Sequence, residues 1–350
     1  MTDVTAARDV LDDVASMMAA SFARMAQRVE FEGFDGVWEA ARKGAMGGKM
    51  LRPRLLLAAR RAYGPDDDEC AVQAAAALEL LHSAFLLHDD VIDRDLLRRG
   101  EPNLIARRRD AARSVGVDEV DALRYGGSCA ILAGDLLISA AHRLLAEIDA
   151  PVERRRALLR VFDGAIGAAA AGEHADLLLS LLRQADEGVI LQTMVHKTAR
   201  YSFTAPLQMG ALLGGASPGE LGALRFIGDA IGVAFQIRDD VLGVFGDPRE
   251  TGKSVLSDLR EGKITLLIAS ARADSSWNTV AHLFGDPALD EIGATQLRAV
   301  IERSGARDHA EAVLARLVDE ARTSMDLAPL PPALIDDLEL VIAGATERVR

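Results

Sequence analysis

The chain has 350 residues, of which 49% are hydrophobic and 27% charged, and its formal net charge is −13. This charge argues against non-specific binding of nucleic acid, which requires a basic surface. It does not exclude anionic substrates, because local cations and metal ions can reverse the field at a site. The two cysteines, Cys70 and Cys129, are too few for a disulfide framework or a zinc cluster and are typical of a reduced cytosol.

The N-terminal segment is acidic and lacks an apolar run, so we expect no signal peptide. No stretch reaches the roughly 18 uninterrupted apolar residues of a membrane span. We therefore expect a cytoplasmic protein without stable membrane insertion.

Helical periodicity dominates the chain, and aromatic residues make up only 4% of it. Helices are predicted over residues 69–94, 125–150, 152–183, 187–213 and 218–244, with further helices from residue 264. Several are apolar nearly all round, which indicates burial in a large bundle. Gly164, Gly167 and Gly172 are predicted points of close helix packing. No linker divides the chain, so we predict one all-α domain over residues 1–350.

Three carboxylates lie at the end of the first long apolar helix. Asp93 is about 40° from Asp89 around a helix, and Asp90 about 100° from it, so the three share one arc. Unpaired like charges on an apolar helix are costly and require a cation. Oxygen ligands suit Mg²⁺, which commonly takes one or two carboxylates together with phosphate oxygens. A solvated helix end, or pairing with nearby arginines, is the alternative.

Two arginines follow these acids in the sequence RRGEPN, where Gly100 and Pro102 predict a loop. The planar guanidinium groups of Arg98 and Arg99 match the geometry of phosphate oxygens. Ordinary ion pairing with Asp93 or Asp95 is an equal alternative.

A second acidic pair, Asp239 and Asp240, ends another apolar helix in FQIRDDVLG. Two Gly-Lys loops follow it, and their ammonium groups, Lys253 and Lys263, could reach the same anion. Neither loop has the frame of a phosphate-binding P-loop.

A basic segment, GGKMLRP, lies near the N-terminus between two helical stretches. Its glycines permit close approach of the backbone, and Lys49 and Arg52 could hold a diphosphate. A basic helix start is more often plain surface.

Taken in order, these motifs resemble those of the trans-isoprenyl diphosphate synthases, also called polyprenyl synthetases. The order is GGKMLRP, ELLHSAFLLHDDVID, RRGEPN, HKTA, FQIRDDVLG, TGKS and DLREGK, which covers the chain from about Gly47 to Thr265. The resemblance implies an all-α bundle of the isoprenoid synthase type around a central cavity. It implies a homodimer that condenses isopentenyl diphosphate with allylic diphosphates, using two or three Mg²⁺ ions.

The resemblance also implies roles for individual residues. The expected isopentenyl diphosphate site comprises Lys49, Arg52, His82 and Arg99. The expected contacts to the allylic diphosphate are Arg98, Lys197, Lys253 and Lys263. The expected polar groups beside the reacting carbons are Thr198 and Gln236, with Lys197 also counted as catalytic. The expected metal ligands are Asp89, Asp90, Asp93, Asp239 and Asp240.

The chemistry of the family explains these residue types. The allylic C–O bond ionises, and Mg²⁺ and basic side chains stabilise the departing diphosphate. The allylic cation needs oxygen dipoles in a dry, apolar cavity. In this family the diphosphate is thought to take up the released proton, so we nominate no catalytic base.

Two positions depart from the family pattern. Gly243 stands where a third Asp is common in the second motif, and Asp247 is a candidate substitute although Gly246 and Pro248 predict a helix end there. Asn103 stands where Thr or Ser is usual, and we expect little consequence.

Product length is predicted from the helix that carries the first acids. Phe85 lies one turn before Asp89 and about 40° from it, with the small Ala84 beside it. A large ring so close to the acids favours a short product, geranylgeranyl diphosphate before farnesyl diphosphate.

A longer-chain synthase, a class I terpene cyclase and a non-catalytic partner subunit are further alternatives. A cyclase would need an Asn/Ser/Glu-type second metal motif, and a partner subunit would be expected to lose its acidic motifs.

Overall fold

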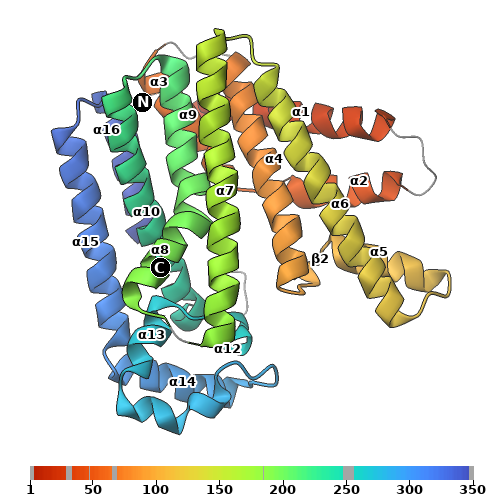
Figure 1. Ribbon diagram of the computed structural model, residues 1–350, viewed down its shortest axis with the longest axis vertical. Helices are drawn as coiled ribbons and strands as arrows, with labels where there is room; N and C mark the ends of the chain where they lie inside the picture. Colours follow the sequence, from red (N-terminus) through yellow and green to blue (C-terminus); the bar gives the residue numbers. More distant parts are fainter. Residues whose placement is uncertain are drawn as a thin grey trace. The chain divides into compact units, whose positions relative to one another are not determined.

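The computed structural model describes residues 4–28, 34–46, 48–64, 69–183, 185–246 and 256–346. Within these ranges the chain is helical apart from one short hairpin, which confirms the predicted all-α class (Figure 1). The chain divides into two compact units, Met1–Leu159 and Arg160–Arg350. The boundary falls inside one continuous helix, α7 (Val152–Leu182). The single domain around a central cavity stays a prediction.

The first unit is built around α4 (Glu69–Ile92). Helix α4 packs against α6 (Glu119–Ala146) and also against α1 (Val4–Arg28) and α3 (Leu51–Ala62). Four successive alanines of α4, residues 74–77, are fully buried and allow neighbouring helices to approach closely. The unit also contains α2 (Asp35–Ala45), β1 (Leu97–Arg98), β2 (Glu101–Pro102) and α5 (Leu104–Ser114).

The second unit is built around α10 (Pro218–Phe245). A capping box of Ser217 and Glu220, with Pro218 as the first helical residue, fixes the start of α10. Its main neighbours are the segment η1 (Val195–Thr204) and α15 (Ala306–Leu327). The remaining elements are α8 (Glu187–Met194), α9 (Ala205–Gly214), α12 (Ser257–Glu261), α13 (Leu266–Arg272), η2 (Ser275–Thr279), η3 (Ala281–Leu283), α14 (Glu291–Arg303) and α16 (Pro332–Thr346).

The helix predicted over residues 187–213 is divided into α8, η1 and α9, and η1 is a π-helix. A Cβ added to Gly172 would lie 2.2 Å from the backbone nitrogen of Lys197, and one added to Gly232 would lie 2.6 Å from the Cα of Ala199. Helices α7 and α10 therefore hold the π-helical backbone closely, and periodicity alone did not reveal it. Of the three glycines predicted as packing points, Gly172 has this role; among the described residues, Gly164 and Gly167 have no neighbour within 4 Å of an added Cβ.

The segment RRGEPN, predicted as a loop, forms the hairpin of β1 and β2. Arg99 and Gly100 at its turn have φ of +55° and +76°, as a two-residue type I′ turn requires. Asn103 caps α5 by accepting the N–H of Ala106 at 3.0 Å, and its amide donates to the carbonyl of Asp95 at 2.7 Å. A Ser or Thr could also cap the helix, which agrees with the small consequence expected for Asn103.

Candidate active site

The first acidic motif lies at the end of α4, where Asp90 points inward. Asp90 is only 2% exposed and accepts two hydrogen bonds from Arg98, at 2.8 Å from Nε and 2.5 Å from Nη2. Burial raises the pKa of Asp90, and the bond to Arg98 opposes that rise. Asp89 is partly exposed, 3.4 Å from the same guanidinium, and Asp93 is exposed just after the helix ends. Asp90 thus anchors Arg98, while Asp89 and Asp93 face outward.

Three of the predicted substrate-binding residues, Arg52, Arg98 and Arg99, lie around a fourth, His82, in the first unit. Burial lowers the pKa of His82 well below its usual value, and the positive charges of Arg52, Arg98 and Arg99 lower it further. His82 is therefore neutral and can donate or accept a hydrogen bond without adding a cation. Lys49, the fifth predicted residue, is exposed at the start of the same basic segment.

Glu79, which was not predicted as a site residue from the sequence, lies in this basic cluster. Glu79 is 3% exposed, and its Oε2 atom has no hydrogen-bond partner among the described residues. A Cβ added to Gly48 would lie 3.5 Å from Glu79 Oε1 and 3.2 Å from Arg99 Nη2, so the two side chains approach Gly48 together. Burial raises the pKa of Glu79, and Arg52 and Arg99 oppose the rise. A single acid within the apolar run AAAALELLHS was the available signal.

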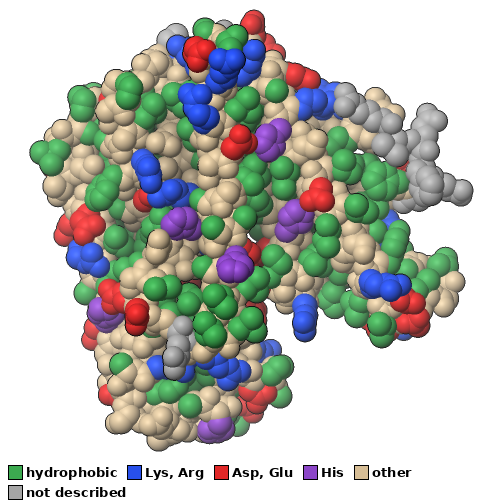
Figure 2. All heavy atoms as spheres, in the orientation of Figure 1, with side chains coloured by type: hydrophobic (Ala, Val, Ile, Leu, Met, Phe, Trp, Pro, Cys, Tyr) green, Lys and Arg blue, Asp and Glu red, His purple; other side chains and the backbone are tan. Residues whose placement is uncertain are grey.

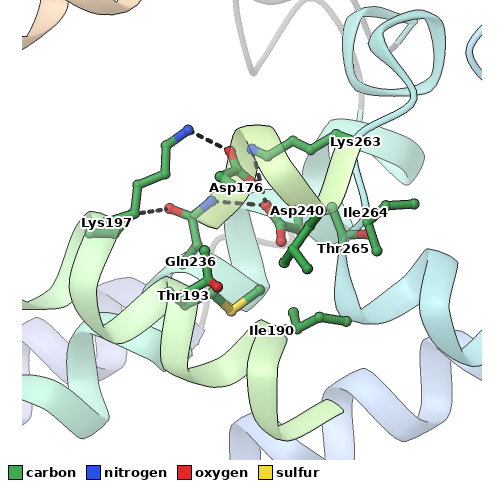
Figure 3. Close-up of a pocket in the computed structure, with 12 residues that line it drawn as sticks. Asp176, Ile190, Thr193, Lys197, Gln236, Asp240, Lys263, Ile264 and Thr265 are labelled. Carbon is green, nitrogen blue, oxygen red and sulfur yellow. Dashed lines mark hydrogen bonds and ion pairs between the residues drawn. The ribbon is translucent and has the colours of Figure 1, made fainter. Parts of the chain in front are cut away.

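A pocket in the second unit brings together five other predicted residues: Lys197, Thr198, Gln236, Asp240 and Lys263 (Figure 3). The Thr198 hydroxyl donates to Gln236 Oε1 at 3.0 Å, and Gln236 Nε2 donates to Asp240 Oδ1 at 2.8 Å. The rest of the wall is mixed: the polar residues are Asp176, Thr193 and Thr265, and the apolar residues are Leu179, Ile190, Met194 and Ile264. The pocket thus holds a chain of polar groups beside an apolar wall on one part of its surface.

Acids compensate both ammonium groups of this pocket. Lys197 Nζ lies 2.5 Å from Asp176 and 2.9 Å from Glu173. Burial would lower the pKa of Lys197, but these two carboxylates outweigh it and raise the pKa. Asp176 and Glu173, both on α7, were missed by the sequence analysis. Their spacing of three residues puts them on one helix face.

Asp240 is the most deeply buried acid of the pocket, at 4% exposure. Burial raises its pKa to about 7, although Lys263, whose Nζ lies 4.0 Å away, opposes the rise. Its neighbour Asp239 is only half-buried. The second acidic pair therefore repeats the division of the first into an inward and an outward carboxylate.

An ion pair fixes the end of α10 that carries these acids. Both terminal nitrogens of the buried Arg238 bind Glu311 on α15, at 2.7 and 2.8 Å. Such a bidentate bond sets the rotation of the helix as well as its position.

The other predicted residues stand apart from these contacts. Ala84 is buried and Phe85 half-buried on α4, one turn before Asp89. Lys253 and Asp247 lie outside the described residues. The roles assigned to all these side chains stay predictions.

Comparison with known proteins decides the family. Residues 37–291 match the polyprenyl synthetase family. The chain belongs to the polyprenyl synthetases. The geranylfarnesyl diphosphate synthase of Aeropyrum pernix is 34% identical over 309 residues, covering 87% of this chain and 91% of that protein.

Other polyprenyl synthetases, which are named for different products, are also similar to this chain. The (2E,6E)-farnesyl diphosphate synthase of Mycobacterium tuberculosis is 36% identical over 235 residues, covering 67% of this chain and 57% of that one. A geranylgeranyl pyrophosphate synthase from Corynebacterium glutamicum, solved with isoprenyl diphosphate and magnesium, has a TM-score of 0.88 and 28% identity over 97% of this chain and 98% of its own. The recognition of the family from its motifs is thereby confirmed.

Proposed function

We propose that the protein is a short-chain trans-prenyl diphosphate synthase that joins isopentenyl diphosphate to allylic diphosphates, with geranylgeranyl diphosphate as its product. The observation that carries this proposal is the pocket in which Thr198, Gln236 and Asp240 form a polar chain beside two ammonium groups. An allylic cation needs such oxygen dipoles in surroundings that exclude water.

Lys197 and Lys263 bind the allylic diphosphate in this proposal. Both ammonium groups face carboxylates in the structure. When diphosphate binds, its oxygens would replace these carboxylates as the partners of the two lysines. The allylic C–O bond breaks with its electron pair on the diphosphate. The oxygens of Thr198 and Gln236 then face the positive carbon.

The basic cluster of the first unit binds isopentenyl diphosphate in this proposal. Arg52 and Arg99 supply permanent charge, Lys49 adds a mobile ammonium, and neutral His82 supplies a hydrogen bond. Glu79 keeps the two guanidinium groups oriented when no substrate is present. The double bond of this substrate forms the new C–C bond, and the departing diphosphate takes up the released proton.

The outward carboxylates fit Mg²⁺, because all of them are hard oxygen ligands at helix ends. We assign Asp89, Asp93 and Asp239 as the ligands, with Asp90 and Asp240 as their buried supports. Two or three bound ions would stabilise charge on the leaving diphosphate. The magnesium in the Corynebacterium glutamicum structure supports this assignment.

We propose that the protein acts in the cytoplasm as a homodimer. By length and composition α4, α6 and α7 could each cross a membrane. Inside the protein, 67% of the relevant window of α4 is buried, half of that of α6 and 28% of that of α7. Helix α6 still exposes Val120, Ile131, Leu132 and Leu136, and hydrophobic side chains are visible over this part of the first unit (Figure 2). Such a surface suits a second copy of the chain. Sedimentation velocity would show a monomer if this is wrong.

Product analysis tests the proposed activity. The protein is incubated with Mg²⁺, labelled isopentenyl diphosphate and each allylic primer in turn, and the dephosphorylated products are separated by chromatography. We expect incorporation of label into geranylgeraniol and none after chelation of Mg²⁺. Failure with every primer would refute the synthase, label-free cyclic products would favour a terpene cyclase, and farnesol or longer alcohols would correct the product.

A further inference from the structure

The second acidic motif contains an unusual close approach at Gly243. A Cβ added to this glycine would lie 2.6 Å from Oδ2 of Asp258, a residue of α12. Residue 243 is one helical turn after Asp239 and about 40° from it. The carboxylate of Asp258 therefore occupies the space in which a side chain at position 243 would begin. This space lies on the face of α10 that carries Asp239.

The backbone around Asp258 holds it in this place. Its carbonyl accepts the N–H groups of Gly262 and Lys263, the latter at 3.1 Å. Leu259, next in sequence, is 1% exposed, and its carbonyl accepts the N–H of Gly285 at 2.8 Å. The short helix α12 is therefore closed at its own end and fixed to the rest of the second unit through Leu259.

Charge around the pocket exceeds what the lysine beside Asp258 can neutralise. The carboxylates of Asp240, Asp258, Asp176 and Glu261 all act on the ammonium group of Lys263. Asp258 also acts on buried Asp240 as a like charge. Lys197 pairs with Asp176 and Glu173, so five acids stand against the two ammonium groups of Lys197 and Lys263. This leaves a surplus of negative charge beside Asp239, which a bound cation would offset.

We propose that Asp258 supplies the third carboxylate of the second acidic motif, reaching from α12 into the space that Gly243 leaves open. In this role Asp258 helps to hold the metal ion assigned to Asp239. The inference rests on the proposed function, since that ion is there to bind the diphosphate. Asp247, considered from the sequence, is not needed for this role.

Binding of Mn²⁺ in the presence of inorganic diphosphate tests the proposal without using catalysis. Free Mn²⁺ is measured by electron paramagnetic resonance for the wild-type chain, for Asp258→Asn and for Glu261→Gln. Glu261→Gln removes another acid of the same short helix that also acts on Lys263, so it serves as the matched control for the loss of one negative charge. We expect Asp258→Asn to weaken Mn²⁺ binding by about 10-fold to 100-fold, and Glu261→Gln to leave it within about twofold of the wild type.

A relocated carboxylate separates this role from a structural one. The double variant Gly243→Asp with Asp258→Ala moves the acid onto α10 and removes the clash, so we expect it to bind Mn²⁺ better than Asp258→Asn. The proposal is overturned if Asp258→Asn binds Mn²⁺ as the wild type does, or if Glu261→Gln weakens binding equally. It is also overturned if the double variant, folded by circular dichroism, gains nothing. If the double variant does not fold, Asp258→Asn against Glu261→Gln still decides.

The two proposals fail separately. A wild-type chain that makes prenyl diphosphates while Asp258→Asn retains full Mn²⁺ affinity disproves only the role of Asp258. A chain that binds Mn²⁺ through Asp258 but consumes no isopentenyl diphosphate with any primer disproves only the synthase.

Discussion

The ends of α4 and α10 carry the same local sequence pattern, but the charge of the buried acid is compensated differently at each. Each has a phenylalanine four residues before an Asp-Asp pair, and in each pair the second acid is buried while the first is partly exposed. Asp90 is compensated by two hydrogen bonds from a permanent cation, Arg98. Asp240 accepts a hydrogen bond from a neutral amide, Gln236, with an ammonium group 4.0 Å away.

The two acids of an Asp-Asp pair therefore have separate roles. The inward acid fixes neighbouring groups, and the outward acid is available to a ligand. At α4 the guanidinium of Arg98 opposes the rise that burial causes in the pKa of the inward acid, whereas at α10 burial raises the pKa of the inward acid to about 7. The outward acids should therefore behave alike on substitution, and the inward acids should differ.

The largest expected effect is on catalysis by the outward acids. Asp89→Asn and Asp239→Asn should each lower kcat/KM by about 10³-fold, because each loses a group that stabilises the developing charge. Asp90→Asn keeps an acceptor for Arg98 and should cost no more than about tenfold, roughly 1.4 kcal/mol. Steady-state kinetics at saturating Mg²⁺ provides the measurement. Equal losses for Asp89→Asn and Asp90→Asn would remove the distinction between inward and outward acids.

Removing the partner of each inward acid should affect stability unequally. Arg98→Met leaves a buried carboxylate without its cation and should lower the free energy of unfolding by about 3 kcal/mol. Gln236→Met removes the two hydrogen bonds that a neutral amide makes, to Asp240 and from Thr198, and should cost about 2 kcal/mol. Urea denaturation of the metal-free protein, followed by circular dichroism, measures both. Adding Asp90→Asn to Arg98→Met should recover part of the loss; no recovery would show that Arg98 acts through other contacts.

The inward acids should also differ in their response to pH. The pKa of Asp240 in the folded protein, about 7, lies above its usual value of 3.8. Between these two pH values the folded protein keeps a proton that the unfolded chain has released. Its contribution to stability is therefore present at low pH and is lost as the pH rises from about 4 to 7, by up to about 1.4 kcal/mol per pH unit. Urea denaturation of the metal-free protein across this range should show that slope. Asp240→Asn should flatten it, and an identical slope in the variant would contradict the assignment.

The two phenylalanines offer a test that concerns product length. Phe85→Ala should lengthen the product by opening space one turn from Asp89, as read by chromatography of the dephosphorylated products. Phe235→Ala is the matched control, because its ring packs on Phe203 at 5.3 Å between centroids and its loss should mainly destabilise the second unit, by about 3 kcal/mol. Unchanged products from Phe85→Ala, or longer products from Phe235→Ala alone, would reverse the assignment.

The smallest effect is expected at Asn103, which fixes the end of the hairpin that carries Arg98. Asn103→Thr keeps the cap of α5 and should change the free energy of unfolding by only a few tenths of a kcal/mol, whereas Asn103→Ala should cost about 1 kcal/mol. Thermal and urea unfolding measure both. A large loss of stability for Asn103→Thr would mean that the hydrogen bond from the Asn103 amide to the carbonyl of Asp95 matters more than the cap.

Helical periodicity and motif order predicted most of this protein, because apolar helices and acidic helix ends are local features. The helix over 152–183 was predicted to within a residue, and the motifs identified the family. The π-helix was not predicted, since it depends on the backbone of α7 and α10 approaching η1 at Gly172 and Gly232. Asp176 and Glu173 were missed for a related reason: an acid's partner on another element leaves no mark on its own sequence neighbourhood. Glu79 did leave a signal, as the single acid of an apolar run.

The contact between Gly243 and Asp258 also constrains how this chain could change by single substitutions. Placing Asp at position 243 first would drive its side chain into the carboxylate of Asp258, while removing Asp258 first would leave the motif with two acids. Each single step is expected to be worse than either end point. The arrangement is thus a local optimum, and the exchange of one acid position for the other requires both substitutions together.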